Sequence, residues 1–175
     1  MNTVTPRIYV ACLASYNNGQ LYGEWIDANQ DTLSLYEKVK NMLVTSPEPD
    51  AEEFAIHDYE GFGDLRIEEY ASLKKVTSFA EFITEYGDLG STVLAHADGD
   101  IEVAQNLLDE CYHGEYDTEE DFAYYWVHEV DGKEVSQFLR YYIDYKAIAR
   151  DFFINDFFSL TVNHKVHVFS CFSHR

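Results

Sequence analysis

Carboxylates at alternating positions are the first residues of this chain whose spacing suggests a chemistry. Asp98, Asp100 and Glu102 stand two residues apart, as the first ligands of a calcium-binding loop do. An EF-hand loop beginning at Asp98 needs glycine at its sixth position for the sharp turn, and Val103 stands there. The sequence therefore argues against a calcium site of this type.

Two histidines lie beside groups with which they could form a catalytic pair. His57-Asp58 has the composition of an acid–base couple, but no nucleophile motif accompanies it, so we interpret it as a strand end with a hydrogen-bonded histidine. Cys111 and His113 are two residues apart on a predicted helix and so point to different faces, which argues against a thiolate–imidazole pair.

No common nucleotide-binding, zinc-protease or serine-hydrolase motif occurs in the sequence. A carboxylate-dependent hydrolase stays open as the weakest alternative, because spacing cannot select a catalytic pair among 32 acids. One acid with a strongly raised pKa inside a cleft would favour it. We expect no enzymatic activity, no catalytic residue, no metal site and no cofactor.

Charge is the dominant feature of the composition. The chain has 32 acidic residues against 12 basic ones, a net charge of −20 at pH 7. Self-repulsion on this scale costs stability, and is typical of proteins in which solubility or a partner requires it. Nucleic acid is not expected as a partner, because binding it needs clustered Lys and Arg. With 14 Tyr and 12 Phe, the chain is too aromatic for a disordered acidic tail.

The acids gather in two tracts. Nine lie between Glu48 and Glu69 with only Arg66 in opposition, and ten lie between Asp98 and Asp121 with no Lys or Arg among them. One such tract is typical of a solvated face, whereas two tracts separated by amphipathic helices favour a binding surface. Acids one helical turn apart have Cβ atoms about 5–6 Å apart, a spacing similar to that of successive phosphates. A rigid scaffold can thus present carboxylates as a copy of a phosphate track and displace DNA from a basic groove, with salt-dependent affinity.

We assign nineteen acids to this surface and expect them to act collectively, so that no single one is essential. They are Asp58, Glu60, Asp64, Glu68, Glu69, Glu81, Glu85, Asp88, Asp98, Asp100, Glu102, Asp109, Glu110, Glu115, Asp117, Glu119, Glu120, Asp121 and Glu129.

The first third of the chain predicts a small α+β unit that holds part of this surface. A β-rich stretch at 7–15 and a second at 20–28 flank Asn18-Gly19, the signal of a two-residue type I′ hairpin turn. Apolar residues at helical spacing over 35–43 predict a helix, and the prolines in 45–49 end it. Residues 52–59 alternate as a third strand does.

Helices are predicted in the middle of the chain. Ser78 and Glu81 form a capping-box pattern before an aromatic stripe, and Gly87 is a natural stop. A second helix, capped by Asp98 or Asp100, has Ile101, Ala104, Leu108, Cys111 and Tyr112 on its inner face and is expected to end near Gly114. A third begins at Asp117 or Thr118 and contains Phe122, Tyr125 and Trp126.

The C-terminal block differs in charge. Between Val135 and Arg175 it carries three acids and five bases, and it is dense in aromatic residues. Residues 157–172, with Asn163-His164 at the turn, predict a closing hairpin. An aromatic, nearly neutral end on a very acidic chain is where we expect a subunit interface.

Cysteine spacing and hydropathy bear on the compartment. Cys12, Cys111 and Cys171 lie far apart with no C-x-x-C spacing, so neither a disulfide framework nor a zinc ribbon is indicated, and a reduced, cytoplasmic setting is expected. No apolar run approaches the length that spans a bilayer, so no membrane association is expected.

Three stretches of the chain are similar to the ArdA family of antirestriction proteins. They are "PRIYVACLASYNNGQLYGEWIDA" (Pro6–Ala28), "EEFAIHDYEGF" (Glu52–Phe62) and "RYYIDYKAIARDFF" (Arg140–Phe153), of which the last resembles the family's antirestriction motif. Order, spacing and aromatic content agree at all three places, so the likeness extends over essentially the whole chain. The closing "SCFSHR" matches no pattern of the family and is assigned no role.

This resemblance implies a non-enzymatic DNA mimic, encoded by a plasmid or transposon, that occupies the DNA-binding channel of type I restriction–modification enzymes and contacts their specificity and modification subunits. It also implies an elongated α+β chain of three small domains in series, with antiparallel sheets and helices. We place an N-terminal α+β domain at 1–61, a mostly helical middle domain at 62–105 and a C-terminal α+β domain at 106–175.

In the family, two chains pair into a curved homodimer through the C-terminal domain. The resemblance places the motif at or near that contact, with Tyr141, Tyr142, Ile143, Asp144, Tyr145, Ala147, Ala149, Arg150, Asp151 and Phe152 as its residues. An alternative stays open, in which the chain is an acidic binding module for another basic DNA-associated protein, such as a nucleoid protein. Competition with labelled duplex for a type I enzyme over a range of salt distinguishes the two.

Overall fold

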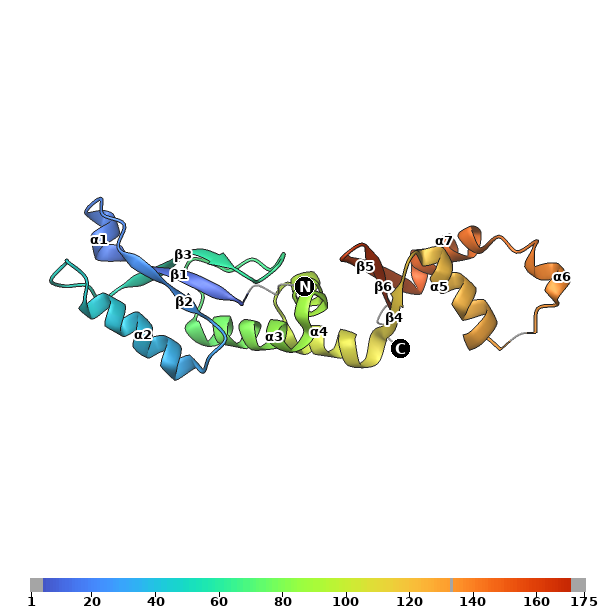
Figure 1. Cartoon of the computed structure of the whole chain (residues 1–175), viewed down its shortest axis with the longest axis horizontal. Coiled ribbons are helices and arrows are strands. Elements are labelled where there is room, and N and C mark those ends of the chain that lie inside the picture. Colours follow the sequence, from blue (N-terminus) through green and yellow to red (C-terminus); the bar gives the residue numbers. More distant parts are fainter. Residues whose placement is uncertain (1–4, 133, 171–175) are drawn as a thin grey trace. The chain divides into compact units, whose positions relative to one another are not determined.

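The structure, a computed structural model, describes residues 5–132 and 134–170 and divides into two compact units, Met1–Ile101 and Glu102–Arg175 (Figure 1). Each unit contains one three-stranded antiparallel sheet, and the described residues form seven α-helices in all. The expected α+β class is therefore confirmed. The division into three domains and the homodimer remain predictions.

The first unit is built on a sheet with strand order β2-β1-β3. Strand β1 (Arg7–Cys12) pairs antiparallel with β2 (Gly23–Asp27) on one side and with β3 (Phe54–Glu60) on the other. Helices α2 (Thr32–Val44) and α3 (Leu73–His96) lie on the same side of this sheet (Figure 1). The core lies between, because alternate residues of β1 such as Ile8 and Val10 are fully buried.

Asn18-Gly19 ends a helix, so the predicted two-residue hairpin turn is wrong. A short helix, α1 (Leu13–Asn17), follows β1, and Asn18 has φ −88°, whereas a type I′ turn needs positive φ at both positions. Gly19 adopts φ +80°, and the next amide, of Gln20, donates to the carbonyl of Ser15 at 2.9 Å. This is the Schellman pattern, so the same dipeptide serves as a helix C-cap.

Helix α2 and strand β3 confirm the helix predicted over 35–43 and the strand predicted over 52–59, whereas the strand predicted over 7–15 ends at Cys12. Leu35, Val39 and Met42 are buried along one face of α2, and the Asp31 carboxylate accepts the Ser34 amide at 3.0 Å as its N-cap. Hydrogen bonds from Ser34 lower the pKa of Asp31 below its usual value.

Helix α3 begins earlier than the sequence predicts. Its N-cap is Ser72, whose hydroxyl accepts the Lys75 amide at 3.2 Å, so the predicted start at Ser78 is wrong. No Glu or Gln stands three residues after Ser72, which is why the capping-box pattern missed it. Gly87 interrupts the helix at φ +61° and ψ −145°, after which the chain continues as helix to His96.

The second unit opens with a helix that changes its winding. Helix α4 (Ile101–Asn106) continues as a π-helical turn, η1 (Leu107–Cys111), before β4 (Tyr112–Tyr116). The predicted helix end at Gly114 is wrong, because Gly114 lies inside β4 beside a bulge. The wider π-helical turn also changes which side chains face inward. Leu107 is buried, whereas Leu108, which was predicted on the inner face, is half-buried.

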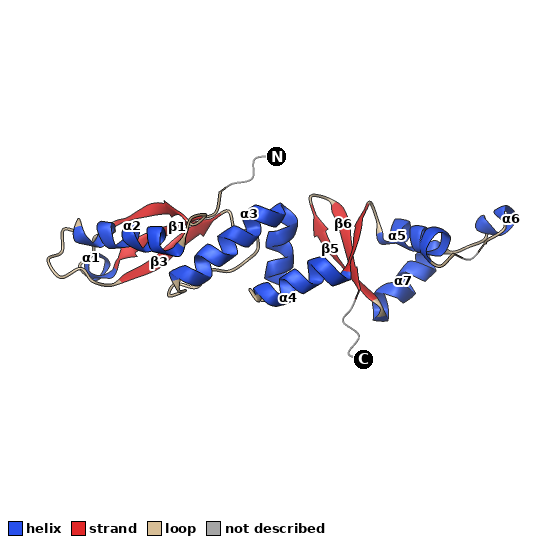
Figure 2. Ribbon diagram, turned by 90° about the horizontal axis from the view of Figure 1, so that it is seen from below, coloured by secondary structure: helices blue, strands red, loops and turns tan. Residues whose placement is uncertain are grey.

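The remaining elements complete a sheet of order β4-β6-β5 (Figure 2), and aromatic residues pack in the core beside it. They are α5 (Glu119–Tyr125), the π-helical turn η2 (Trp126–Val130), α6 (Gln137–Arg140), α7 (Tyr145–Asn155), β5 (Phe157–Val162) and β6 (Lys165–Ser170).

The closing hairpin and the helix after Thr118 are confirmed. Asn163 and His164 have φ +50° and +66°, as a type I′ turn requires, and they join β5 to β6. Phe122, Phe157 and Val168 form the buried centre of this unit. Helices α5 and α7 lie side by side against it (Figure 2).

Two further features concern thiols and helix length. Cys12 and Cys111 are buried free thiols, and Cys171 lies with the rest of the 171–175 tail outside the described residues. Among the helices of residues 5–132 and 134–170, none combines the length and the apolar character needed to cross a membrane.

Candidate functional site

The acids assigned to the first unit stand on β3, on the loop that follows it, on α3 and on the turn after α3. Nine of these ten side chains are exposed, and Glu60 is half-buried. Glu60 forms an ion pair with Arg7, so its charge is already offset within the chain. The nine exposed acids are Asp58, Asp64, Glu68, Glu69, Glu81, Glu85, Asp88, Asp98 and Asp100.

Helix α3 fixes part of this set rigidly. Glu81 and Glu85 lie one turn apart on its exposed face, while Phe82 and Ile83 between them are buried. Residues at i and i+4 have Cβ atoms about 5–6 Å apart. Because the buried stripe anchors the helix, the spacing of the two carboxylates depends only on side-chain rotamers.

The loop between β3 and α3 carries both signs of charge. Asp64, Glu68 and Asp98 line a hollow of about 330 Å³ together with Arg66 and Lys75. The two cations offset part of the local negative charge, so this segment contributes less to an acidic surface than its acid count suggests.

The acids of the second unit lie on α4, on η1, on β4, in the loop after β4, at the start of α5 and on η2. Eight of the nine assigned side chains are exposed, and Glu119 is half-buried. The Glu119 carboxylate accepts a hydrogen bond from the Ser159 hydroxyl of β5 at 2.7 Å, which ties this acid to the sheet. The eight exposed acids are Glu102, Asp109, Glu110, Glu115, Asp117, Glu120, Asp121 and Glu129.

Three consecutive acids are stabilised at the start of α5. The Thr118 hydroxyl accepts the Asp121 amide at 3.1 Å as the helix N-cap. Glu119, Glu120 and Asp121 then occupy the first turn, where the positive end of the helix dipole favours negative charge. The fold therefore holds a dense carboxylate group at a place where repulsion is partly compensated.

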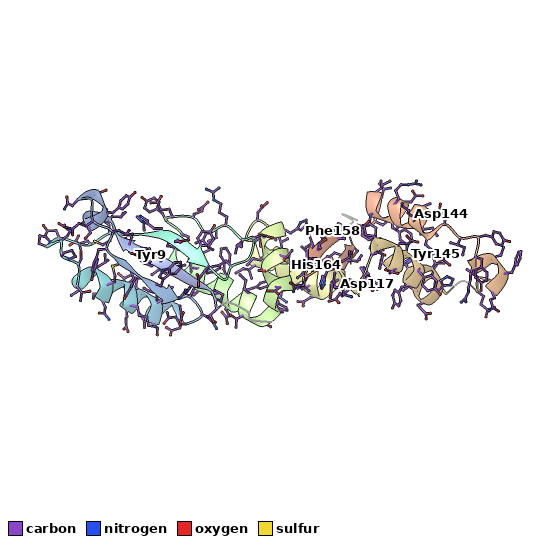
Figure 3. All side chains as sticks on the ribbon, turned by 45° about the horizontal axis from the view of Figure 1, so that its top comes forward. Tyr9, Asp117, Asp144, Tyr145, Phe158 and His164 are labelled. Carbon is purple, nitrogen blue, oxygen red and sulfur yellow. The ribbon has the colours of Figure 1, made fainter. Side chains whose placement is uncertain are left out.

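One acid of this tract has a cation that sequence spacing did not reveal. Lys165 of β6 forms an ion pair with Asp117, which stands beside the Asn163-His164 turn (Figure 3). Hydrogen bonding and charge from Asp117 raise the pKa of Lys165. The predicted closing hairpin was the only sequence feature that could have indicated this ion pair. Pairing of β6 with β4 places residue 165 beside residue 117.

Two histidines of this unit lie among core side chains, His167 buried and His113 half-buried. His167 accepts or donates a hydrogen bond with the Tyr112 hydroxyl at 2.8 Å and lies 3.6 Å from Glu115. Burial lowers its pKa, against the opposing effect of Glu115. His113 lies between aromatic rings with a buried Nε2 that has no hydrogen-bond partner, and burial lowers its pKa as well.

The segment that resembles the antirestriction motif is half exposed and half core. Tyr141 and Tyr142 are 84% and 72% exposed, and Asp144, Arg150 and Asp151 are exposed as well. Within α7, Ala149 is buried and Tyr145, Ala147 and Phe152 are half-buried, and Ile143, just before the helix, is half-buried as well.

Helix α7 is capped and anchored at its first residues. The Asp144 carboxylate accepts the Ala147 amide at 2.9 Å. The Tyr145 hydroxyl lies 2.6 Å from His128 Nε2 of η2, and its ring lies against Tyr124 (Figure 3 labels Asp144 and Tyr145). These contacts position the exposed tyrosines just before the helix.

The residue pairs considered for catalysis do not form a catalytic arrangement. His57 lies 3.9 Å from Glu69 and makes an edge-to-face contact with Tyr16, while Cys111 is buried and His113 belongs to the aromatic core. Within residues 5–132 and 134–170, no cluster of three or more His, Cys, Asp or Glu could hold a metal ion.

The family model described as antirestriction protein (ArdA) matches residues 8–166, which include both units and both acidic tracts. No curated protein matches the chain.

Proposed function

The chain belongs to the ArdA family of antirestriction proteins, and from this premise we propose that it is a DNA mimic that inhibits type I restriction–modification enzymes. In this proposal the protein occupies their DNA-binding channel through contacts with the specificity and modification subunits, and binds neither nucleic acid nor membrane. The family is one of inhibitors and binding proteins, not of enzymes.

The observation that carries the proposal is the placement of exposed carboxylates on regular elements. From Asp98 to Asp131 the chain has twelve acids and no Lys or Arg, and helix, π-helical turn and strand hold most of them in fixed positions. A flexible acidic tail would lose entropy on binding, whereas preplaced charges avoid much of that cost. Rigid placement is therefore the property that a phosphate surrogate needs.

Electrostatics supports a collective action of these acids. One exposed ion pair contributes roughly 0–1 kcal/mol, so a basic groove gains useful affinity only from many pairs together. Binding releases the anions that such a groove holds, and affinity should then fall steeply with salt.

For assembly, we propose a curved homodimer of elongated chains, each with three small domains in series, joined through the C-terminal block. Phe138, Tyr141 and Tyr142 support this contact, because they are 68%, 84% and 72% exposed on a segment that carries little net charge. Large exposed aromatic side chains of this kind are enriched in protein interfaces. A cytoplasmic location and a plasmid or transposon origin are parts of the same proposal.

Protection of unmodified DNA tests the function. A purified type I enzyme is given unmodified DNA and ATP with increasing amounts of this protein, and cleavage is expected to stop as the protein saturates the enzyme. A gel shift with DNA alone controls for sequestration of the substrate, which is not expected. Cleavage that persists at saturating protein would overturn the proposal and leave the binding module for another basic DNA-associated protein.

A further inference from the structure

One face of the first sheet carries two aromatic rings among carboxylates. The register of β1 places Tyr9 opposite Trp25 on β2 and opposite Asp58 on β3. Residues opposite each other across strands project from the same face. Ile8 and Ile26, which alternate with Tyr9 and Trp25, are buried toward the helices. The row Trp25, Tyr9, Asp58 therefore lies on the face away from α2 and α3.

The neighbouring row of residues on the same face already holds one guanidinium group, that of Arg7. Arg7 stands opposite Asp27 on β2 and Glu60 on β3. Its guanidinium carbon lies 4.9 Å from the centre of the Trp25 ring, and the same group forms an ion pair with Glu60. One guanidinium is thus held jointly by a ring and a carboxylate.

The two rows together offer the same contacts to a second guanidinium. Trp25 remains 39% exposed beside Tyr9, with ring centres 5.6 Å apart, and Asp27 and Asp58 are exposed on either side. Three carboxylates against the one guanidinium of Arg7 leave this face with excess negative charge.

The charge and the rings together select the occupant. Aromatic faces attract cations, and a planar guanidinium both stacks on a ring and donates a fork of hydrogen bonds to a carboxylate. Lysine, a compact and strongly hydrated charge, gains less from the rings. Nucleic acid could stack on the rings, but its phosphates would meet the three carboxylates.

We infer that this surface, the Tyr9–Trp25 face, binds arginine side chains of a protein partner. The rings of Tyr9 and Trp25 stack on the guanidinium, and Asp27 and Asp58 accept its hydrogen bonds. The inference rests on the proposed function for the identity of the partner, a type I enzyme whose DNA groove supplies the arginine. The rings then take the place of stacked bases, while the nineteen acids assigned to the acidic surface take the place of phosphates.

Peptides test the chemistry of the face without any enzyme. The chain has two tryptophans, so the full-length ¹⁵N-labelled protein gives two indole resonances, which Trp25→Phe assigns. Titration with octa-arginine should shift the Trp25 resonance and leave that of Trp126, in the second unit, in place. Octa-lysine, of equal charge, should bind several-fold more weakly. Equal affinity for the two peptides, or no shift at Trp25, would overturn the inference.

A double variant tests the partner. Tyr9→Leu with Trp25→Leu should weaken binding to the type I enzyme about 3- to 10-fold with an unchanged salt dependence, because the carboxylates remain. Tyr36→Leu is the matched control, since Tyr36 is 54% exposed on α2, on the other side of the sheet. Circular dichroism checks that each variant folds.

The two arms separate failure of the inference from failure of the proposed function. A double variant that binds the enzyme as tightly as the parent contradicts the inference while the function stands. A parent protein that does not bind the enzyme contradicts the function, and the arginine preference of the face is then decided by the peptides alone.

Discussion

Neutralising six exposed glutamates of the acidic surface should weaken binding to a type I enzyme about 100-fold. The six are chosen because their side chains are exposed and lie outside the helix caps and ion pairs described above. They are Glu68, Glu81, Glu85, Glu110, Glu120 and Glu129, each changed to Gln. Glu60 and Glu119 are left in place, because they pair with Arg7 and Ser159.

The magnitude follows from exposure. An exposed ion pair contributes about 0.5 kcal/mol on average, so six contribute about 3 kcal/mol, and each 1.4 kcal/mol is a tenfold change in affinity. A single Glu→Gln change should then weaken binding only about twofold. Reversing all six to Lys adds repulsion with the basic groove and should abolish inhibition.

The assay is displacement of labelled duplex from the purified enzyme at several salt concentrations. The control variant neutralises six exposed acids that are not assigned to the surface, and so has the same net charge of about −14. These are Glu24, Glu37, Asp50, Glu52, Glu53 and Glu134. The surface variant should lose affinity and salt dependence, and the control should lose little of either. Equal losses in the two variants, or loss of binding from one surface Glu→Gln, would refute the proposal that carboxylates at fixed positions act collectively as phosphate mimics.

Three further predictions concern the fold and the assembly. Gly87→Ala should destabilise the first unit by about 1–3 kcal/mol, because φ +61° with ψ −145° is nearly restricted to glycine; unchanged stability in urea would show that the helix break tolerates a Cβ. Burial lowers the pKa of His113 and His167 in the folded state, so the unfolded state binds more protons as pH falls below the ordinary value of 6.5. Thermal melts of the second unit should accordingly be constant above that pH and fall below it, and a melt indifferent to pH between 7.5 and 5.5 would contradict this. Tyr141→Ser with Tyr142→Ser should shift sedimentation toward monomer with little loss of stability, since both side chains are exposed; an unchanged dimer would place the contact elsewhere.

Two similar turn signals in the sequence had different outcomes in the structure. Asn163-His164 became a type I′ turn because both flanking strands pair at once. Asn18-Gly19 carries a similar signal, yet the residues before it form a helix and the glycine caps it. The sequence alone could not decide between these outcomes, because the same positive φ at glycine satisfies both.

The exposure of the acids could be predicted, but their partners could not. Carboxylates stay in water unless paired, so most of the assigned acids are exposed, as their charge requires. The cation beside Asp117 comes from Lys165, 48 residues along the chain, and Arg7 reaches Trp25 only through the β1–β2 register. Such long-range contacts depend on strand pairing, which sequence spacing does not encode.

Competition with DNA shows whether the protein occupies the DNA-binding channel of the enzyme. A labelled duplex bound to a purified type I enzyme is titrated with the unmodified protein between low and high salt. Full displacement is expected at low salt, with an apparent affinity that falls steeply as salt rises. A ternary complex of enzyme, duplex and protein, or displacement indifferent to salt, would contradict the proposed DNA mimicry.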